Sequence, residues 1–415
     1  MTTTGEDRFI FDPLAGGFVD DPYQQYAALR ETDPVQHSDL LAGWVVTRHD
    51  DVGRLLRDPT ISSSIHNATP TPLTENELAR LGRQPRAART VVLQDDPDHA
   101  RTRHLMAEPF RARQVGGLRE SITQRVHAAF DRLHHQHGSG PTSLDLVAEF
   151  AYPLPVEIFS EMLGVPDEDH PKFRYWTQCV ARTVDPVMTD EERTECLAGL
   201  DEMYCYLEEQ AAGKRENPTG DLMSHLVTAE VDGEGLSHDD LMAQLVTLYL
   251  AGHEPTAALI SAGMLALLRE PDQLAKLRAE PHLLGNAIHE LLRFDGPNQF
   301  VRRITTEPIV LSGVELAGGA VVYASPASAN RDARRWGDDA DRVVIDRPDA
   351  SRHLQFGAGA HACLGSHLAR LQIEIAFAAI LDRLDQVELA GDPVWNTRMF
   401  IRGLASLPIA CTIRR

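Results

Sequence analysis

The chain has 415 residues, of which 43% are hydrophobic and 24% are charged, and these proportions exclude a disordered or collagen-like chain. Its formal net charge of −21 at pH 7 disfavours general binding to nucleic acids, which needs a positively charged face. The N-terminal residues lack the features of a secretory signal, and no apolar run approaches the roughly 18 residues of a membrane span. We therefore expect a cytoplasmic protein that binds neither nucleic acid nor membrane.

We expect residues 1–20 to form a flexible N-terminal arm, and the whole chain, 1–415, to form a single domain. Apolar residues recur every three or four positions in five segments, which predicts helices over Leu118–Leu133, Glu191–Ala212, Leu241–Leu268, Leu283–Phe294 and Leu364–Leu384. Short strands are predicted at Gly43–Thr47, Ile309–Leu311, Ala320–Tyr323 and Pro408–Ile413. Because strands and helices do not alternate regularly, we predict a mainly α fold with small β-sheets.

The five cysteines are scattered and show no C-x-x-C spacing, which disfavours a disulfide framework and a cysteine-rich zinc site. One of them, Cys363, follows a Gly-rich loop and directly precedes a long predicted helix. A helix N-terminus helps to deprotonate a thiol, a step that needs about 2 kcal/mol at pH 7. Glycines let the backbone approach a flat ligand. The pattern therefore indicates a single thiolate that ligates a metal.

The residues of this loop leave other interpretations open. A lone cysteine is often simply a small buried apolar residue. The pattern Gly357-x-Gly359-x-x-Ala362 matches a loose dinucleotide-binding fingerprint, although no βαβ unit surrounds it. A zinc site would have only His361 and Cys363 as evident ligands.

The same segment, Phe356–Gly365, reads F-x-x-G-x-H-x-C-x-G and resembles the haem-binding signature of cytochromes P450 at every fixed position. The resemblance to bacterial members of this family extends from about Asp21 to Pro408. It implies the cytochrome P450 fold, a triangular helical prism that encloses haem b. It also implies that Cys363 is the proximal ligand of the haem iron, and that Phe356 and Gly365 belong to the haem-binding loop. A thiolate ligand donates electron density to the iron and favours cleavage of the O–O bond.

The pair Glu290 and Arg293, three residues apart in a predicted helix, resembles the E-x-x-R motif of the family. By the same resemblance, Arg342 would be the second arginine of this network. Val343 departs from the phenylalanine that the family usually has after that arginine. We assign these three residues a structural role in supporting the haem-binding loop.

Haem carries two propionates, which need cationic or hydrogen-bonding partners inside a protein. The resemblance implies that His99, Arg103, Arg303 and His361 are these partners. Arg302 is the alternative to Arg303 by one step of register.

The segment Ala251–Thr256 resembles the family motif A-G-x-[D/E]-T-[T/S], which lies over the distal face of the haem. Ala251 would leave room beside the haem, and Glu254 occupies the acid position that helps to relay protons. Pro255 stands where the family has a threonine and has no hydroxyl group. Thr256 lies one residue later, about 100° further round the helix. Glu254 and Thr256 are the candidate catalytic residues, and whether Thr256 replaces the missing threonine stays open.

Two reactions are compatible with a proline at position 255. In the first, water or a substrate hydroxyl relays protons, and the enzyme inserts oxygen into a secondary metabolite. In the second, the enzyme abstracts hydrogen or electrons from an aromatic or cyclic-peptide substrate, and the radicals couple to form C–C or C–N bonds. Two rival classes remain, a nicotinamide-dependent dehydrogenase and a haem-binding sensor.

Substrate contacts are expected from three segments, namely the long helix, the stretch after E-x-x-R and the C-terminal turn. The candidates are Thr247, Leu250, Ala251, Gln299, Phe300, Val301, Phe400 and Ile401. The segments Ile61–Val92 and Trp176–Met188 are expected to form a lid.

No reductase is evident in the chain, so we expect electrons to come from a separate ferredoxin that is served by a ferredoxin reductase. Basic residues near the predicted proximal side would form the docking patch for this carrier. They are Arg101, Arg111, Arg113, Arg352 and Arg370.

Overall fold

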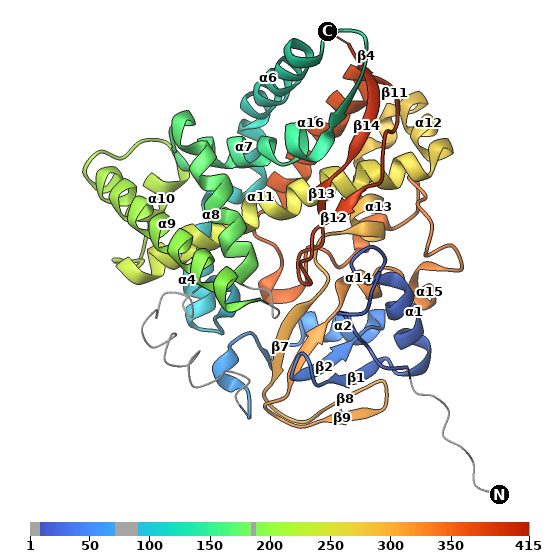
Figure 1. Cartoon of the computed structure of the whole chain (residues 1–415). Helices are drawn as coiled ribbons and strands as arrows, with labels where there is room; N and C mark the ends of the chain where they lie inside the picture. Colours follow the sequence, from blue (N-terminus) through green and yellow to red (C-terminus); the bar gives the residue numbers. More distant parts are fainter. Residues whose placement is uncertain (1–8, 71–89, 184–187, 415) are drawn as a thin grey trace, which may run out of the picture.

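The computed structural model describes residues 9–70, 90–183 and 188–414. Within these ranges helices dominate, and the strands form small sheets (Figure 1). The helices of the first half are α1 (Tyr23–Thr32), α2 (His49–Arg57), α4 (Asp98–Ala107), α5 (Ala112–Gly117), α6 (Arg119–His137), α7 (Pro153–Leu163), α8 (His170–Thr183) and α9 (Asp190–Glu216). Those of the second half are α10 (Leu222–Thr228), α11 (His238–Arg269), α12 (Pro271–Ala279), α13 (Leu284–Asp295), α14 (Pro326–Ala329), α15 (Ala333–Trp336) and α16 (Ser366–Arg383).

The principal sheet joins strands from opposite ends of the chain, in the order β1 (Val35–Ser38), β2 (Gly43–Val46), β10 (Val321–Ala324), β7 (Val301–Thr305) and β3 (Ile61–Ser62). Only the β2–β10 pair is parallel, and its register places Tyr323 opposite Val45. A second, antiparallel sheet has the order β11 (Leu384–Leu389), β14 (Pro408–Ile413) and β4 (Pro141–Asp145). Three hairpins complete the strands, and they are β5 (Glu230–Val231) with β6 (Glu234–Gly235), β8 (Ile309–Leu311) with β9 (Val314–Leu316), and β12 (Val394–Trp395) with β13 (Leu404–Ser406).

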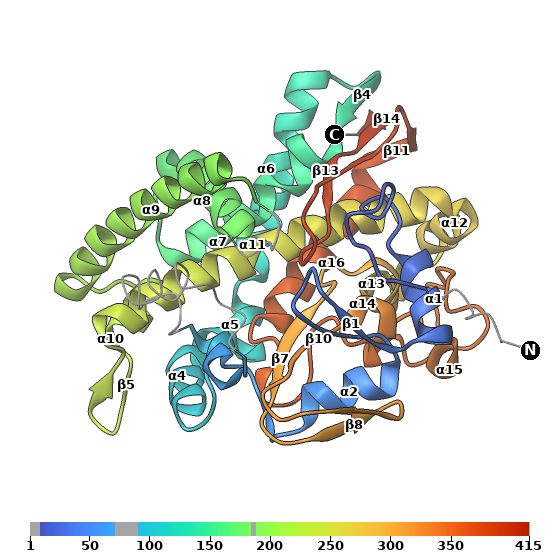
Figure 2. The same cartoon turned by 60° about the horizontal axis from the view of Figure 1, so that its bottom comes forward.

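The long helix α11 crosses the middle of the molecule in both views (Figures 1 and 2). It begins where the Ser237 hydroxyl accepts the Asp240 N–H at 3.1 Å, which satisfies one of the free donors of the first turn. Its central residues are apolar on nearly all sides, the pattern of a helix inside a core. It packs on α7, α8, α13 and α16 and continues through Pro255 to Arg269.

All five predicted helices and all four predicted strands are present, with boundaries that shift by a few residues. The expectation of a flexible arm is wrong for residues 9–20. Phe11 and Phe18 are buried and pack on Tyr26 in the core beside α1. Gln36 binds this segment through the N–H of Phe11 and the carbonyl of Phe9. Residues 9–20 lack the apolar spacing of a helix, but the side chains of Phe11 and Phe18 are nevertheless buried against the principal sheet. Residues 1–8 lie outside the described residues.

Candidate active site

The loop that carries Cys363 is shaped by two glycines with left-handed backbone conformations. Gly357 has a φ angle of +65° and Gly359 a φ angle of +69°. A side chain at Gly359 would place its Cβ atom 2.6 Å from the Leu56 carbonyl oxygen of α2, so only glycine fits. The loop closes where the Cys363 N–H donates to the Phe356 carbonyl at 2.7 Å, and α16 begins three residues later at Ser366.

The Cys363 thiol is solvent-accessible, yet the surrounding protein desolvates it and raises the pKa of the thiol. The two observations agree if the side chain lies at the bottom of a recess. The Gly365 N–H and the Arg103 guanidinium act against the desolvation and lower the pKa of the thiol. Both interactions favour the thiolate, the form in which cysteine binds a metal. No group of three or more potential metal-ligating His, Cys, Asp or Glu side chains occurs among the described residues.

Two histidines and two arginines form a cluster beside this loop, and they are His99, Arg103, Arg303 and His361. His99 is 3% exposed, and its ring lies against the ring of His361 at a centroid distance of 4.0 Å and an interplanar angle of 34°. Its Nδ1 atom lies 3.2 Å from Asp96, and its buried Nε2 atom has no hydrogen-bond partner. The pKa of His361 is lowered to about 4 by burial and by the charges of His99, Arg303 and Arg103, while Asp95 acts in the opposite direction.

Arg303 belongs to the same cluster and is 7% exposed. Burial lowers the pKa of its guanidinium to about 10, and its Nη1 atom donates to the Arg302 carbonyl at 2.8 Å. Within the described ranges, Arg303 forms no ion pair with a carboxylate. Buried cations need an anionic partner, so this cluster suits a ligand with carboxylates, such as the two propionates of haem. Arg302 points toward Tyr323 and away from this cluster, which favours the register with Arg303.

The Glu290–Arg293 pair is fully buried in α13. Arg293 donates to both carboxylate oxygens of Glu290, through Nε at 2.7 Å and Nη2 at 2.9 Å. Its Nη1 atom also donates to the carbonyl groups of Asn330 and Ala340, both at 2.7 Å. The motif thus binds three separate segments together beneath the loop of Cys363.

The prediction that Arg342 supplies the second arginine of this network is wrong. The Arg342 side chain is 70% exposed and lies 4.0 Å from Glu270, and only its backbone carbonyl accepts from Arg293. Arg347 takes the expected place, with Nε 3.0 Å from Oε1 of Glu290. The chain turns back at Val344, whose N–H also donates to Glu290, and this turn aims Arg347 rather than Arg342 at the carboxylate.

One face of α11 is less buried than the rest of the helix. Thr247, Ala251 and Pro255 follow one another at four-residue spacing on this face, and Ala251 is exposed despite its central place in the chain. Leu250 is also only partly buried. Thr256 is 3% exposed and lies off this face, so the hydroxyl that the motif retains does not occupy the position of Pro255.

Glu254 points away from that face into a buried polar cluster. Its carboxylate accepts from the Tyr152 hydroxyl at 2.8 Å and pairs with Nη1 of Arg398 at 2.6 Å. His253 Nε2 lies 3.4 Å away, within ion-pair distance but outside hydrogen-bond geometry. Burial alone would raise the pKa of Glu254, but His253, Arg398 and Tyr152 outweigh it and lower the pKa to about 2. Sequence reasoning missed Tyr152 and Arg398, because both are more than 100 residues from Glu254 and neither belongs to a motif.

The predicted substrate contacts have different surroundings in the structure. Phe300 is 5% exposed and packs edge-on against Phe11 and Phe400, which contradicts its expected role as a substrate contact. Gln299 is buried, accepts from Tyr26 at 3.1 Å, and lines a cavity of about 250 Å³. The remaining candidates of this region are partly buried, and they are Val301, Phe400 and Ile401.

The predicted lid is described only in part, because residues 71–89 and 184–187 lie outside the described residues. In its second segment, the indole N–H of Trp176 donates to Glu202 at 3.1 Å, which ties α8 to α9.

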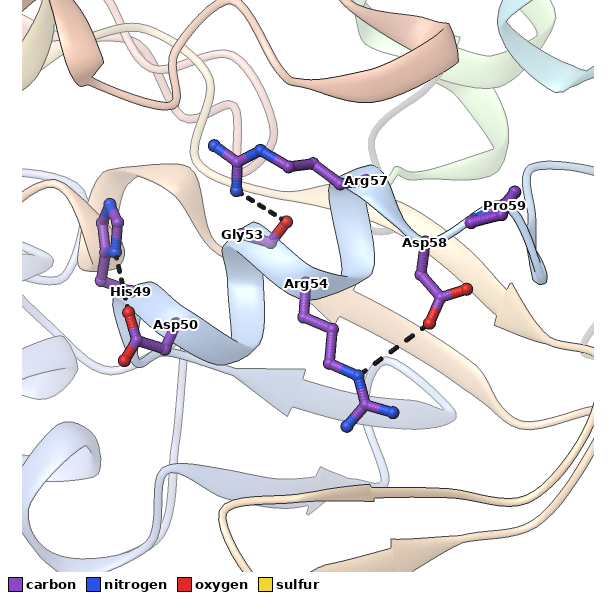
Figure 3. A pocket seen from close by; sticks show the side chains of 7 residues that line it. All are labelled: His49, Asp50, Gly53, Arg54, Arg57, Asp58 and Pro59. Atoms are coloured by element: carbon purple, nitrogen blue, oxygen red, sulfur yellow. Dashed lines mark hydrogen bonds and ion pairs between the residues drawn. The ribbon is translucent and has the colours of Figure 1, made fainter.

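A broad depression of about 600 Å³ lies on α2 and is lined by His49, Asp50, Gly53, Arg54, Arg57, Asp58 and Pro59 (Figure 3). Its charges pair with one another, as in Arg54 with Asp58 at 3.9 Å and His49 with Asp50 at 3.3 Å. The Arg57 guanidinium donates to the Gly53 carbonyl of its own helix. These local pairs are typical of a solvated helix face, and we do not assign the depression a catalytic role.

Among the described residues, no helix combines the length and the apolar character that crossing a bilayer would require.

Comparison with known proteins identifies the family. The model of the cytochrome P450 family matches residues 153–408. Cytochrome P450 107B1 of Saccharopolyspora erythraea is 37% identical over 98% of this chain and 99% of its own length. The cytochrome P450 monooxygenase PikC of Streptomyces venezuelae is also 37% identical, over 98% of this chain and 95% of its own length. The crystal structure of epothilone D-bound cytochrome P450epoK superimposes with a TM-score of 0.88 at 30% identity, over 98% of this chain and 100% of that one. A mainly helical fold, a cysteine shortly before a helix and beside the buried Arg303, and matches along nearly the whole chain together show that the protein is a monooxygenase of the cytochrome P450 family.

Proposed function

We propose that this enzyme uses haem b, dioxygen and electrons from a ferredoxin to insert oxygen into a secondary metabolite. The observation that carries the proposal is the exposed Cys363 shortly before α16, beside the buried guanidinium of Arg303, which forms no ion pair with a described carboxylate. When bound, haem b would supply the iron at which dioxygen is activated, with the Cys363 thiolate as its ligand. His99, Arg103, Arg303 and His361 would hold its propionates.

The substrate would lie against the less buried face of α11. Thr247, Leu250 and Ala251 would contact it from this helix, and Val301 and Ile401 from the strand β7 and the C-terminal turn. Packing explains the glycine at position 252, because a Cβ atom there would lie 2.5 Å from the ring of Phe159 in α7. The helix α11 can therefore lie close to α7 at the point where its motif faces the site.

Radical coupling of an aromatic or cyclic-peptide substrate is the second candidate reaction. It is favoured by Pro255, which lies on the same face as Ala251 and brings no hydroxyl group to that face. Glu254 is buried in its ion pair with Arg398, so two usual elements of a proton relay are missing from this face. Abstraction of hydrogen atoms or electrons from the substrate depends less on such a proton relay than oxygen insertion does.

Electron delivery would use the arginines of the predicted docking patch. Several of them are partly neutralised, as in Arg111 with Glu108 at 2.9 Å and Arg101 with Glu234 at 3.5 Å. Arg113 is exposed and forms no ion pair within the described chain. It therefore offers a free charge to an acidic carrier.

Spectroscopy and isotope labelling test the proposal. The reduced CO complex of the purified holoenzyme should show the spectrum of a thiolate-ligated haem, and Cys363→Ala should lose it. Turnover with ferredoxin, reductase and NAD(P)H under ¹⁸O₂ should then label the product of a substrate that shifts the Soret band. A product that has lost hydrogen without gaining ¹⁸O would favour coupling. A thiolate-type spectrum that persists in Cys363→Ala would refute the assignment of the ligand.

A further inference from the structure

The cavity of about 250 Å³ beside Gln299 has an unusual wall for a protein of net charge −21. Three arginines line it, and none of the described residues in its wall is acidic. The rest is mostly apolar and comes from the N-terminal segment and the C-terminal turn. The complete lining is Pro13, Leu14, Ala15, Phe18, Val19, Pro22, Arg182, Gln299, Thr397, Arg398, Met399 and Arg402. Such a wall suits a ligand with an apolar body and a negatively charged group.

Two of the three arginines are fixed by carboxylates behind the wall. Arg182 donates to both oxygens of Glu192, each at 3.1 Å. Arg402 pairs with Asp295 at 2.5 Å, and its guanidinium lies 3.3 Å from the centre of the Trp395 ring. These two residues contribute positive potential, but each is committed to its own carboxylate.

Arg398 is different, because its carboxylate partner is the acid of the oxygen-activation motif. Its side chain is 17% exposed and lines the cavity, while Glu254 behind it is 2% exposed. The guanidinium therefore separates the cavity from Glu254. An anion that enters the cavity would meet Arg398 before any other group of the Glu254 cluster.

We propose that this cavity is a subsite for a substrate carboxylate, which pairs with Arg398 and thereby releases Glu254. This inference rests on the proposed function, and it names the substrate class as an apolar molecule with a carboxylate. In the exchange, one ion pair breaks and another forms. Glu254 then takes up one proton from solvent, since the loss of the guanidinium makes its buried negative charge more costly.

The surroundings of Glu254 support this exchange. After release, the neighbours of its carboxylate are the Tyr152 hydroxyl and His253, whose Nδ1 atom lies 2.6 Å from the Tyr249 carbonyl. Arg174 stacks on the Tyr152 ring at 5.1 Å and does not reach the carboxylate. His253 and Tyr152 still lower the pKa of Glu254 after the exchange, but the contribution of the guanidinium is lost, so the pKa of Glu254 rises. A protonated Glu254 could donate a proton, which the ion-paired carboxylate with a pKa of about 2 cannot do near neutral pH.

The test compares two ligands that differ only in charge, octanoate and octanamide, by isothermal titration calorimetry on the haem-loaded enzyme. We expect octanoate to bind at least tenfold more tightly than octanamide to the wild type. Arg398→Gln should abolish the difference, and Arg398→Lys should keep part of it. Arg215→Gln, at an exposed arginine near the end of α9, is the matched control and should change neither affinity.

Glu254→Gln separates partner exchange from a simple structural role. This variant removes the competitor of the ligand, so octanoate should bind more tightly than to the wild type. Titrations in two buffers of different ionisation enthalpy should show uptake of one proton by the wild type and none by Glu254→Gln. If Arg398→Gln does not fold, as judged by its CO spectrum, the Glu254→Gln result decides.

Equal affinities of wild type for octanoate and octanamide, or weaker binding of octanoate by Glu254→Gln, would overturn the inference. Either result leaves the proposed function intact if the CO spectrum is of the thiolate type. Loss of that spectrum in the wild type would instead overturn the proposed function.

Discussion

Arg347 places its Nε atom 3.0 Å from Oε1 of Glu290, in a region where the carboxylate is completely buried. The same carboxylate receives two hydrogen bonds from Arg293, and Asp339 pairs with Arg347 at 2.8 Å from the other side. This network connects α13 with residues 339–347, the segment that precedes the loop of Cys363. It therefore fixes α13 to the segment that leads into this loop.

Arg347→Ala should destabilise the holoenzyme by about 1.5–3 kcal/mol, because the buried Glu290 loses a charge-assisted hydrogen bond and keeps only its pair with Arg293. Arg342→Ala, at the exposed arginine, should change the free energy of unfolding by less than about 0.5 kcal/mol. Urea unfolding followed by circular dichroism measures both values. Equal effects of the two substitutions would contradict the assignment of Arg347 to the network.

Arg303→Gln should accelerate haem loss roughly tenfold or more, since a buried charge-assisted hydrogen bond contributes about 1.5–3 kcal/mol. Arg302→Gln is the matched control, because Arg302 is the adjacent residue and faces Tyr323. The rate of haem transfer to apomyoglobin measures both effects. Faster loss from Arg302→Gln than from Arg303→Gln would show that the register is the other one.

Pro255→Thr should retain the haem content and change the ratio of products or the oxygen consumed per product. The reason is that a hydroxyl group would return to the α11 face that carries Ala251. Product analysis and an oxygen electrode measure the two quantities. Thr256→Val provides the comparison, and identical products and oxygen consumption in Pro255→Thr would mean that the missing hydroxyl is irrelevant to the reaction.

Charge reversal at Arg113 should weaken turnover driven by ferredoxin and leave turnover driven by hydrogen peroxide nearly unchanged. The effect should shrink at high salt, because surface electrostatics are screened. Arg215→Glu controls for the change in net charge at a distant exposed site. Equal losses in the two assays would reject Arg113 as part of the docking patch.

Because His353 is buried, we expect the free energy of unfolding to depend on pH. Burial, followed by the positive charges of His289, Arg370 and Arg293, lowers its pKa to about 3 in the folded protein. The neutral ring is therefore favoured by folding, and this contribution is complete above the unfolded pKa of about 6.5 and is lost as the pH falls toward 3.

The free energy of unfolding of the wild type should accordingly fall between pH 7.5 and 5, by at most about 1.4 kcal/mol per pH unit for this group. His353→Gln should show a smaller slope over the same range, although it is less stable at pH 7.5. Urea titrations at several pH values decide the matter. A slope that does not differ between the two proteins would contradict the prediction.

The sequence by itself determined the features that local pattern controls. Apolar periodicity located α6, α9, α11, α13 and α16, because one buried face must recur at the helical period. The glycines and Cys363 indicated a thiolate that ligates a metal, because close backbone approach and ligation each demand a particular residue type, and the resemblance of the segment to the cytochrome P450 signature implied that this metal is haem iron. The family and the position of the departure at Pro255 followed from the same short segments.

The tertiary structure alone decided which charges meet. The resemblance implied Arg342, but the turn at Val344 aims Arg347 at Glu290 instead. Arg398 lies 144 residues from Glu254 in the chain, yet the fold brings their charged groups to 2.6 Å. Local sequence carries no record of such pairs, because long-range packing sets the positions of the backbones that carry them. The same reason explains Phe300, whose burial depends on an N-terminal segment that its own neighbours in sequence do not reveal.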